Sequence, residues 1–175
     1  MTPFDRMDPE RYPWPKRYDI SGVNLRNLFV SLANPGAATN YPTHSLFNAS
    51  TGPHVLVVRS MTYAGAAATA FHRLQRIRGA LGTNLGNEVP VWAGERNPVG
   101  SHNYLDNVTQ ITPDFFITPG AAFNAGGVPN VVWSVLPPGW SLVWQNATTT
   151  GTVPFSFWWE ELSIDDPWLG SVGFR

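Results

Sequence analysis

The stretch that decides the fold of this chain runs from residue 136 to residue 161 and reads LPPGWSLVWQNATTTGTVPFSFWWEE. A Pro-Pro-Gly turn leads into a run of aromatic and β-branched residues, a threonine-rich loop follows, and a second such run closes the stretch. Runs of this composition between turn residues are typical of consecutive β-strands. In the second run Ser156 and Glu160 share one face of an extended strand, and we expect them to be the more exposed residues. The other face, which we expect to be buried, carries Val153, Phe155, Phe157 and Trp159.

Composition favours the same class of fold. The 175 residues include sixteen Gly and sixteen Pro, and a Pro costs about 3 kcal/mol inside a helix. Charged residues make up only 13% of the chain, against roughly 25% in typical soluble domains. We therefore expect one all-β domain with much of its surface covered by partners. A large aromatic core is the alternative explanation of the eight Trp.

Short strands with turn signals between them fill the body of the chain. Residues 54–63 include Val55, Leu56, Val57 and Val58 without polar alternation, which is typical of a central strand covered on both faces. Turn signals about every ten residues are the pattern of a β-sandwich. Further short strands are expected at 27–32, 89–92 (an edge strand), 109–111, 115–117 and 131–135.

Two segments are less regular. Residues 66–78 fit either a strand or an amphipathic helix, and the strand-like neighbours favour a strand. Residues 79–104 are rich in Gly and Asn and are expected to be mostly loop. The glycine run at 79–86 lacks the Gly-Lys-Ser/Thr ending of a phosphate-binding loop, so we expect no nucleotide there.

The beginning of the chain differs in character from the body. Its prolines favour extended, polyproline-like backbone, and its aromatic residues Tyr12, Trp14 and Tyr18 have little within the segment to pack against. This arm either folds back onto its own sandwich or reaches onto a neighbouring subunit. The expected parts of the chain are an arm at 1–24, a β-sandwich at 25–162 and a C-terminal tail at 163–175.

No convincing catalytic or metal-binding set emerges from the sequence. His102 and Asp106 are four residues apart in a Gly/Asn-rich region, and one such pair does not make a zinc site. Glu160 and Glu161 are adjacent, so on a strand they point to opposite faces and cannot act together as acid and base. We expect them to lie at a solvated strand end, and we expect no enzyme activity, no metal and no cofactor.

Charge and targeting signals exclude further classes. The net charge is −1, and the basic cluster Arg73, Arg76 and Arg78 favours a solvated face or inter-subunit salt bridges over nucleic-acid binding. No apolar run approaches 18 residues, so we expect no membrane span. The polar start lacks the apolar stretch of a signal peptide. With no cysteine for disulfides, the protein is expected to be made and kept in a cytoplasm.

Three parts of the chain together resemble small accessory virion proteins of tailed bacteriophages. They are the run 55–59, the loop 90–95 and the closing segment 138–161, within a likeness that covers roughly 54–162. The resemblance implies a jelly-roll-like antiparallel β-sandwich, and it implies no catalytic residues. It also implies a homotrimer that binds the major capsid protein or other virion subunits, in a particle assembled in the host cytoplasm.

The function expected from the resemblance is capsid cement or decoration. A tail-fibre or baseplate receptor-binding module is the alternative within virions. A carbohydrate-binding module or lectin that binds host surface glycans is the alternative from another class. Coplanar exposed Trp rings form sugar platforms, and the candidate rings are those of Trp140, Trp144 and Trp158. The candidate interface residues are Tyr12, Trp14, Tyr18, Trp140, Trp144 and Trp158.

Overall fold

The computed structural model describes residues 27–34, 41–63, 72–91, 97–107, 115–118, 134–146, 154–167 and 169. In these residues the chain is almost entirely β-structure. The strands, in order, are β1 (Leu28–Ala33), β2 (Tyr41–Asn48), β3 (His54–Tyr63), β4 (His72–Arg78), β5 (Thr83–Asn84), β6 (Glu88–Pro90), β7 (Gly100–Asn107), β8 (Phe115–Thr118), β9 (Ser134–Leu136), β10 (Trp140–Asn146) and β11 (Phe155–Ser163).

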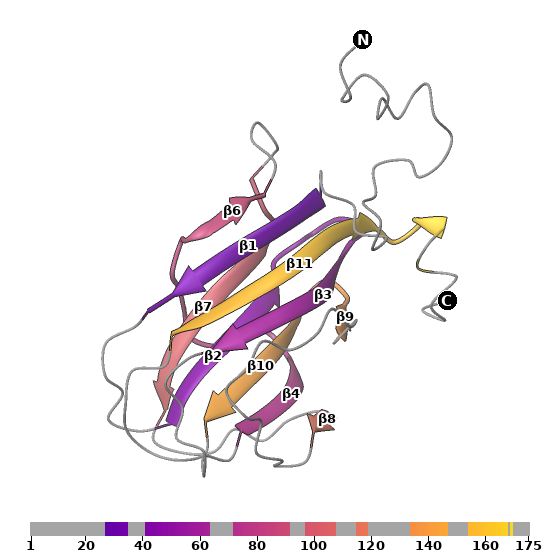
Figure 1. Ribbon diagram of the computed structural model, residues 1–175. Coiled ribbons are helices and arrows are strands. Elements are labelled where there is room, and N and C mark those ends of the chain that lie inside the picture. The colour runs from indigo at the N-terminus through magenta and orange to yellow at the C-terminus, as the bar shows by residue number, and fades with distance from the viewer. Residues whose placement is uncertain are drawn as a thin grey trace.

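These strands form two antiparallel sheets that pack face to face, which confirms the predicted β-sandwich. One sheet has the order β6-β1-β11-β3-β9 and the other has the order β5-β7-β2-β10-β4-β8. In Figure 1 the first sheet is the near layer, with β11 between β1 and β3, and the second sheet lies behind it.

The order of the strands identifies a jelly roll. Among the described residues the first strand pairs with the last, β1 with β11, and going inward along the chain β2 pairs with β10, β3 with β9 and β4 with β8, all antiparallel. The chain is therefore a long antiparallel ribbon whose successive pairs alternate between the two sheets, which is jelly-roll topology. The excursion β5–β6–β7 lies between β4 and β8 in sequence, and it extends both sheets at one side, β6 beside β1 and β7 beside β2.

The turn at Pro137, Pro138 and Gly139 was predicted correctly. The Trp140 N–H donates to the Pro137 carbonyl at 3.2 Å, and Gly139 has a φ of 78°. Pro at the second position and a Gly with positive φ at the third are what a type II turn requires. This turn reverses the chain from β9 in one sheet to β10 in the other.

The core between the sheets contains the predicted aromatic face of β11. Phe155, Phe157 and Trp159 are fully buried, as their alternation predicted. The Phe155 and Phe157 ring centroids are 4.7 Å apart, and Trp159 stacks on Phe29 of β1 at 6.0 Å. The rest of this core comprises Leu46, Leu56, Val58, Met61, Leu74, Leu136, Leu142 and Trp144.

Strand β3 is covered on both faces, also as predicted. Leu56 and Val58 face the core between the sheets. Val55 and Val57 face outward, where they pack with Leu162 and with Leu169, which comes after the last strand. The chain thus covers this part of the outer face with residues of its own C-terminal segment.

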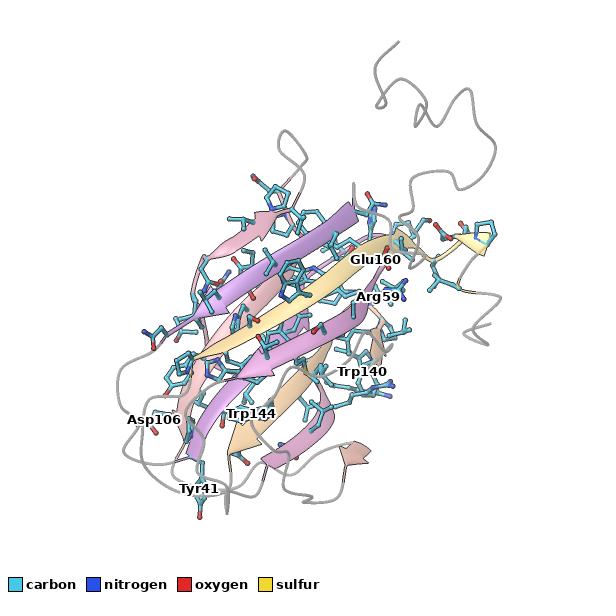
Figure 2. The ribbon with its side chains drawn as sticks, viewed as in Figure 1. Tyr41, Arg59, Asp106, Trp140, Trp144 and Glu160 are labelled. Atoms are coloured by element: carbon cyan, nitrogen blue, oxygen red, sulfur yellow. The ribbon has the colours of Figure 1, made fainter. Side chains whose placement is uncertain are left out.

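The expectation that Ser156 and Glu160 are exposed was wrong, although their face is the outer one. Ser156 is buried and its hydroxyl bonds that of Thr62 at 2.5 Å. Glu160 is fully buried and forms an ion pair with Arg59. The register of β11 on β3 shifts between Trp158 and Trp159, so β3 has one extra residue there. A β-bulge of this kind re-aims a side chain, and here it allows Arg59 to meet Glu160 on the outer face (Figure 2).

Several other local predictions were wrong or only partly covered. Residues 100–107 form the regular strand β7, so His102 and Asp106 lie on a strand and not on a loop. Strand β2 was not predicted at all. For the ambiguous segment 66–78, residues 72–78 form a strand, and the remainder lies outside the described residues, as do 109–111.

We expect Phe157→Ala to lower the free energy of unfolding by about 3–5 kcal/mol, because it leaves a cavity between the sheets. Ile164→Ala is the control, since Ile164 is 41% exposed and surface substitutions usually change stability by no more than about 0.5 kcal/mol. Urea unfolding followed by tryptophan fluorescence measures both. Equal losses in the two variants would contradict this description of the core.

Candidate functional site

The six residues predicted as a candidate interface do not form one site. Tyr12, Trp14 and Tyr18 lie outside the described residues. The other three are described and have different environments. Trp140 and Trp144 lie on β10 in one sheet, and Trp158 lies on β11 in the other.

Trp144 is a core residue, and its assignment to an exposed surface was wrong. It is only 2% exposed, and its ring lies 4.9 Å from Phe155 and 5.8 Å from His44. The alternation of β10 turns it inward together with Leu142. It therefore cannot stack on a sugar, and a coplanar platform of Trp140, Trp144 and Trp158 does not exist.

Trp140 (Figure 2) is half-buried at the start of β10, and two arginine side chains lie over its ring. The guanidinium carbons of Arg76 and Arg78 lie 5.3 Å and 5.0 Å from the ring centroid. Trp140 pairs with Arg78 across the neighbouring strands β10 and β4. Both distances are within the range of cation–π attraction, so this part of the predicted basic cluster interacts with an aromatic ring of its own chain.

Trp158 belongs to an apolar surface on the outer face of the first sheet. Val30 on β1 lies directly between Val89 on β6 and Trp158 on β11, because it pairs with both. Leu32 lies two residues further along β1, on the same face. We call these four residues the apolar row. Val89 is 51%, Leu32 66% and Trp158 37% exposed. Directly opposed side chains on neighbouring strands lie about 4.5–5.5 Å apart, so the row is one continuous patch.

The apolar row is bounded by groups that the chain pairs itself. Arg59 and Glu160 form their ion pair further along β11 and β3, and beyond them lies the cluster of Val55, Val57 and Leu169. One part of the outer face is thus covered by the chain itself and another part, the row, is exposed. A hydrophobic patch of this kind, next to polar groups, is the usual mark of an interaction surface.

The edge beside the row is closed to strand addition. The Val91 N–H donates to the Leu28 carbonyl of β1 at 2.9 Å. The backbone N–H and C=O groups of successive residues in a strand point in opposite directions. Those of Val89 and Val91 point to β1, so the backbone groups of Glu88 and Pro90 point to the other edge of β6. Pro90 has no N–H to offer there, a common way of blocking an edge strand. A partner of this region therefore meets the face of the sheet.

A second group of polar residues, which the sequence analysis missed, lies buried between the sheets. The Ser31 hydroxyl lies 2.8 Å from Nδ1 of His102, and Nε2 of His102 lies 3.0 Å from Nδ1 of His44. The two imidazoles are packed among aromatic rings, with His44 stacked on Phe155 at 4.9 Å and His102 edge-on to Phe157 at 4.9 Å. These residues come from β1, β2 and β7, so the network joins the two sheets.

This serine–histidine–histidine chain resembles a nucleophile with its base, but a substrate has no access to it. Ser31 is 1% exposed, and both histidines are completely buried. Burial lowers the pKa of His102 from 6.5 to about 3, so the ring is neutral at physiological pH. Burial, and secondarily the Asp106 carboxylate, raises the pKa of Tyr104, whose ring lies 5.0 Å from His44. The network satisfies polar groups in the core and stabilises one arrangement of the sheets.

Metal ligation and membrane insertion receive no positive support from the described part of the chain. Within it, no three His, Cys, Asp or Glu side chains gather as a metal site requires. Nor does that part contain a helix with the length and apolarity needed to cross a membrane. Comparisons of the sequence with protein-family models and with curated proteins, and of the structure with solved structures, found no match.

The neutral His102 makes stability depend on pH. The unfolded chain binds a proton at this residue below about pH 6.5, whereas the folded chain does so only near pH 3. The stabilisation is therefore complete above pH 6.5 and is lost as the pH falls, at up to about 1.4 kcal/mol per pH unit. Between pH 7.5 and 5.5 we expect His102 to account for a loss of about 1.4 kcal/mol.

Urea unfolding at the two pH values, compared between the wild type and His102→Gln, measures this contribution. The variant is expected to be less stable at both pH values, but its stability should change less between them. An equal change in both proteins would show that His102 does not titrate on unfolding as described.

Proposed function

We propose that this chain is a structural, non-enzymatic virion protein that cements or decorates the capsid of a tailed phage through subunit contacts. The sequence resemblance is the source of this proposal. Jelly-roll topology is compatible with it, since this fold occurs in viral capsid proteins, as well as in lectins and cupins. Because one fold serves many functions, the surface of the molecule has to distinguish among them.

The apolar row is the observation that carries the proposal. Leu32, Val89 and Trp158 expose apolar surface on one sheet face, and burying such surface contributes roughly 25 cal/mol per Å² before the entropic costs of association. Trp is among the residues most enriched at interface hot spots. Charged residues are depleted from the cores of protein interfaces. Only 13% of the residues of this chain are charged, which is consistent with an extensive interface.

The surfaces favour assembly over the glycan-binding alternative. A sugar platform needs coplanar exposed rings, yet Trp144 is buried in the core and the Trp140 ring carries Arg76 and Arg78. Trp158 stands in the other sheet, beside aliphatic side chains. The partners that we propose are the major capsid protein and further copies of the chain, in the trimer that the sequence resemblance implies.

Shell stability tests the proposal. Particles that lack the protein should assemble but lose resistance to heat and osmotic shock, because a ligand that binds only the assembled lattice stabilises it by mass action. Added wild-type protein should restore the resistance, and a Leu32→Ser/Trp158→Ser double variant should not. Ile164→Ser is the matched control, since it makes an equally polar change at an exposed position outside the row.

Two results would contradict the cement role. Particles that are equally robust without the protein, combined with binding of the protein alone to host cells, would favour the receptor-binding module. Loss of glycan binding on Trp140→Ala or Trp158→Ala, with shell stability unchanged, would favour a lectin.

A further inference from the structure

The two sheets are joined differently at the two sides of the sandwich. β6 and β7 lie at one side, and β3 and β9 lie toward the other (Figure 1). Near β9 the core takes Leu56 and Val58 from the first sheet and Leu142 from the second. None of the inward positions on β6 and β7 carries Val, Leu, Ile or Met. These positions are Glu88, Pro90, Gly100, His102, Tyr104 and Asp106.

A buried histidine link joins the sheets at the β6/β7 side. The Ser31 hydroxyl of β1 lies 2.8 Å from Nδ1 of His102, whose Nε2 lies 3.0 Å from Nδ1 of His44. The contact between the two rings needs one nitrogen that donates and one that accepts. It therefore does not form between two fully protonated imidazoles.

Two carboxylates form further links at this side. Glu88 of β6 accepts the backbone N–H of His102 at 2.5 Å. Glu161 of β11 accepts the N–H groups of Val99 and Gly100, where β7 begins, both at 2.8 Å. Hydrogen bonds to an ionised carboxylate are roughly twice as strong as those between neutral groups. A proton on either carboxylate therefore weakens its link.

The β3/β9 side has a polar link of a different kind. The Asn48 amide of β2 donates to the carbonyl groups of His54 and Leu136, both at 2.9 Å. A side-chain amide does not titrate, and the aliphatic packing near it contains no ionisable group. Among the described residues, the links at the β6/β7 side thus respond to protons, whereas the Asn48 link does not.

Separation of the sheets at the β6/β7 side lets water reach His102, and this raises the affinity of the ring for a proton. Burial lowers the pKa of His102 from 6.5 to about 3 in the closed sandwich. The closed form therefore has its full advantage above pH 6.5 and loses it as the pH falls toward 3. Between pH 7.5 and 4.5 the titration of His102 alone raises the ratio of open to closed molecules about a hundred-fold.

Other ionisable groups near this ring do not reverse that direction. β1 supplies only the Ser31 hydroxyl. A carboxylate favours a charged imidazole, but burial outweighs it here, because the pKa of His102 is lowered. The ionisable side chains on the inward faces of β2, β6, β7 and β11 are His44, Glu88, Tyr104, Asp106 and Glu161.

We propose that the fold contains an acid-sensitive opening, in which the two sheets separate at the β6/β7 side as His102, Glu88 and Glu161 take up protons, while the β3/β9 side stays closed. β7 remains paired with β2, and β6 with β1, through their backbones. The opening therefore parts the two layers without unfolding the strands. This inference is independent of the proposed function, since it concerns only the links between the sheets of one chain.

Native-state hydrogen exchange of the full chain, followed by NMR at pH 7.5 and pH 4.5, tests the opening. The N–H groups of Val99, Gly100 and His102 report on it directly, because they donate to Glu161 and Glu88. Their protection factors should fall about a hundred-fold or more at the lower pH, to values well below those of amides within β3 and β10. Equal protection at the two sides at pH 4.5 would show that acid unfolds the whole domain. That result, or protection that does not change with pH, overturns the inference.

His102→Gln removes the titrating ring from the histidine link. In this variant the protection of Val99 and Gly100 should change about ten-fold less between the two pH values than in the wild type. His54→Gln is the matched control, because His54 is partly exposed at the start of β3 and its side chain belongs to none of the three links. The control should keep the wild-type change. A His102→Gln protein that keeps the full change would contradict the inference.

Glu161→Gln provides a second variant, which tests the opening even if His102→Gln does not fold. Gln keeps an oxygen that can accept the N–H groups of Val99 and Gly100, but it takes up no proton. The protection of these two amides should therefore depend less on pH than in the wild type. An unaltered pH dependence in Glu161→Gln would overturn the inference.

Discussion

The packing of β11 between β1 and β3 is the constraint on which the rest of the structure depends. This one strand closes the rolled ribbon, since it is the last strand that the structure describes and it pairs with the first. Its inner face supplies Phe155, Phe157 and Trp159 to the core, and its outer face supplies Trp158 to the apolar row. Because side chains alternate along a strand, the register that buries the core also determines which residues face outward.

A buried carboxylate fixes that strand against the added strand β7. One oxygen of Glu161 accepts hydrogen bonds from the Val99 and Gly100 N–H groups at 2.8 Å and from Trp159 Nε1 at 3.1 Å. Position 100 has to be glycine for this approach, since a Cβ there would lie 2.7 Å from Trp159 Nε1. Together with the Ser31–His102 contact, this bonding ties the excursion β5–β7 to both sheets, and so it supports β6 and Val89 at the edge of the row.

The features that the sequence predicted well are those that apolar side chains alone determine. β3, β10 and β11 were recognisable because their runs are rich in Val, Trp and Phe, and the jelly-roll order is compatible with strands of this number and spacing. β2 and β7 were missed because their inward positions include His44 and His102, whose burial is possible only through each other and Ser31. Glu160 looked like a solvated residue because its partner, Arg59, is 101 residues away in sequence. Pairing between residues so far apart leaves no signal in the local sequence. The exposure of Leu32 and Val89 leaves none either, because it depends on which face of the sheet the rest of the fold covers.

The division of the outer face is the strongest physical reason to regard this molecule as a subunit. On one part of the sheet the chain covers Val55 and Val57 with its own Leu169, and it neutralises Glu160 with Arg59. On the other part it leaves Val89, Leu32 and Trp158 exposed. The C-terminal segment thus covers apolar side chains on one part of this face and leaves those on the other part exposed. Single exposed apolar residues scattered over a surface are common and need no explanation. Here the exposed residues adjoin across the strands β6, β1 and β11 and lie beside the edge that carries Pro90, so the exposed surface is continuous. The subunit contacts of the proposed function would form on this surface, by side chains packed against the sheet face.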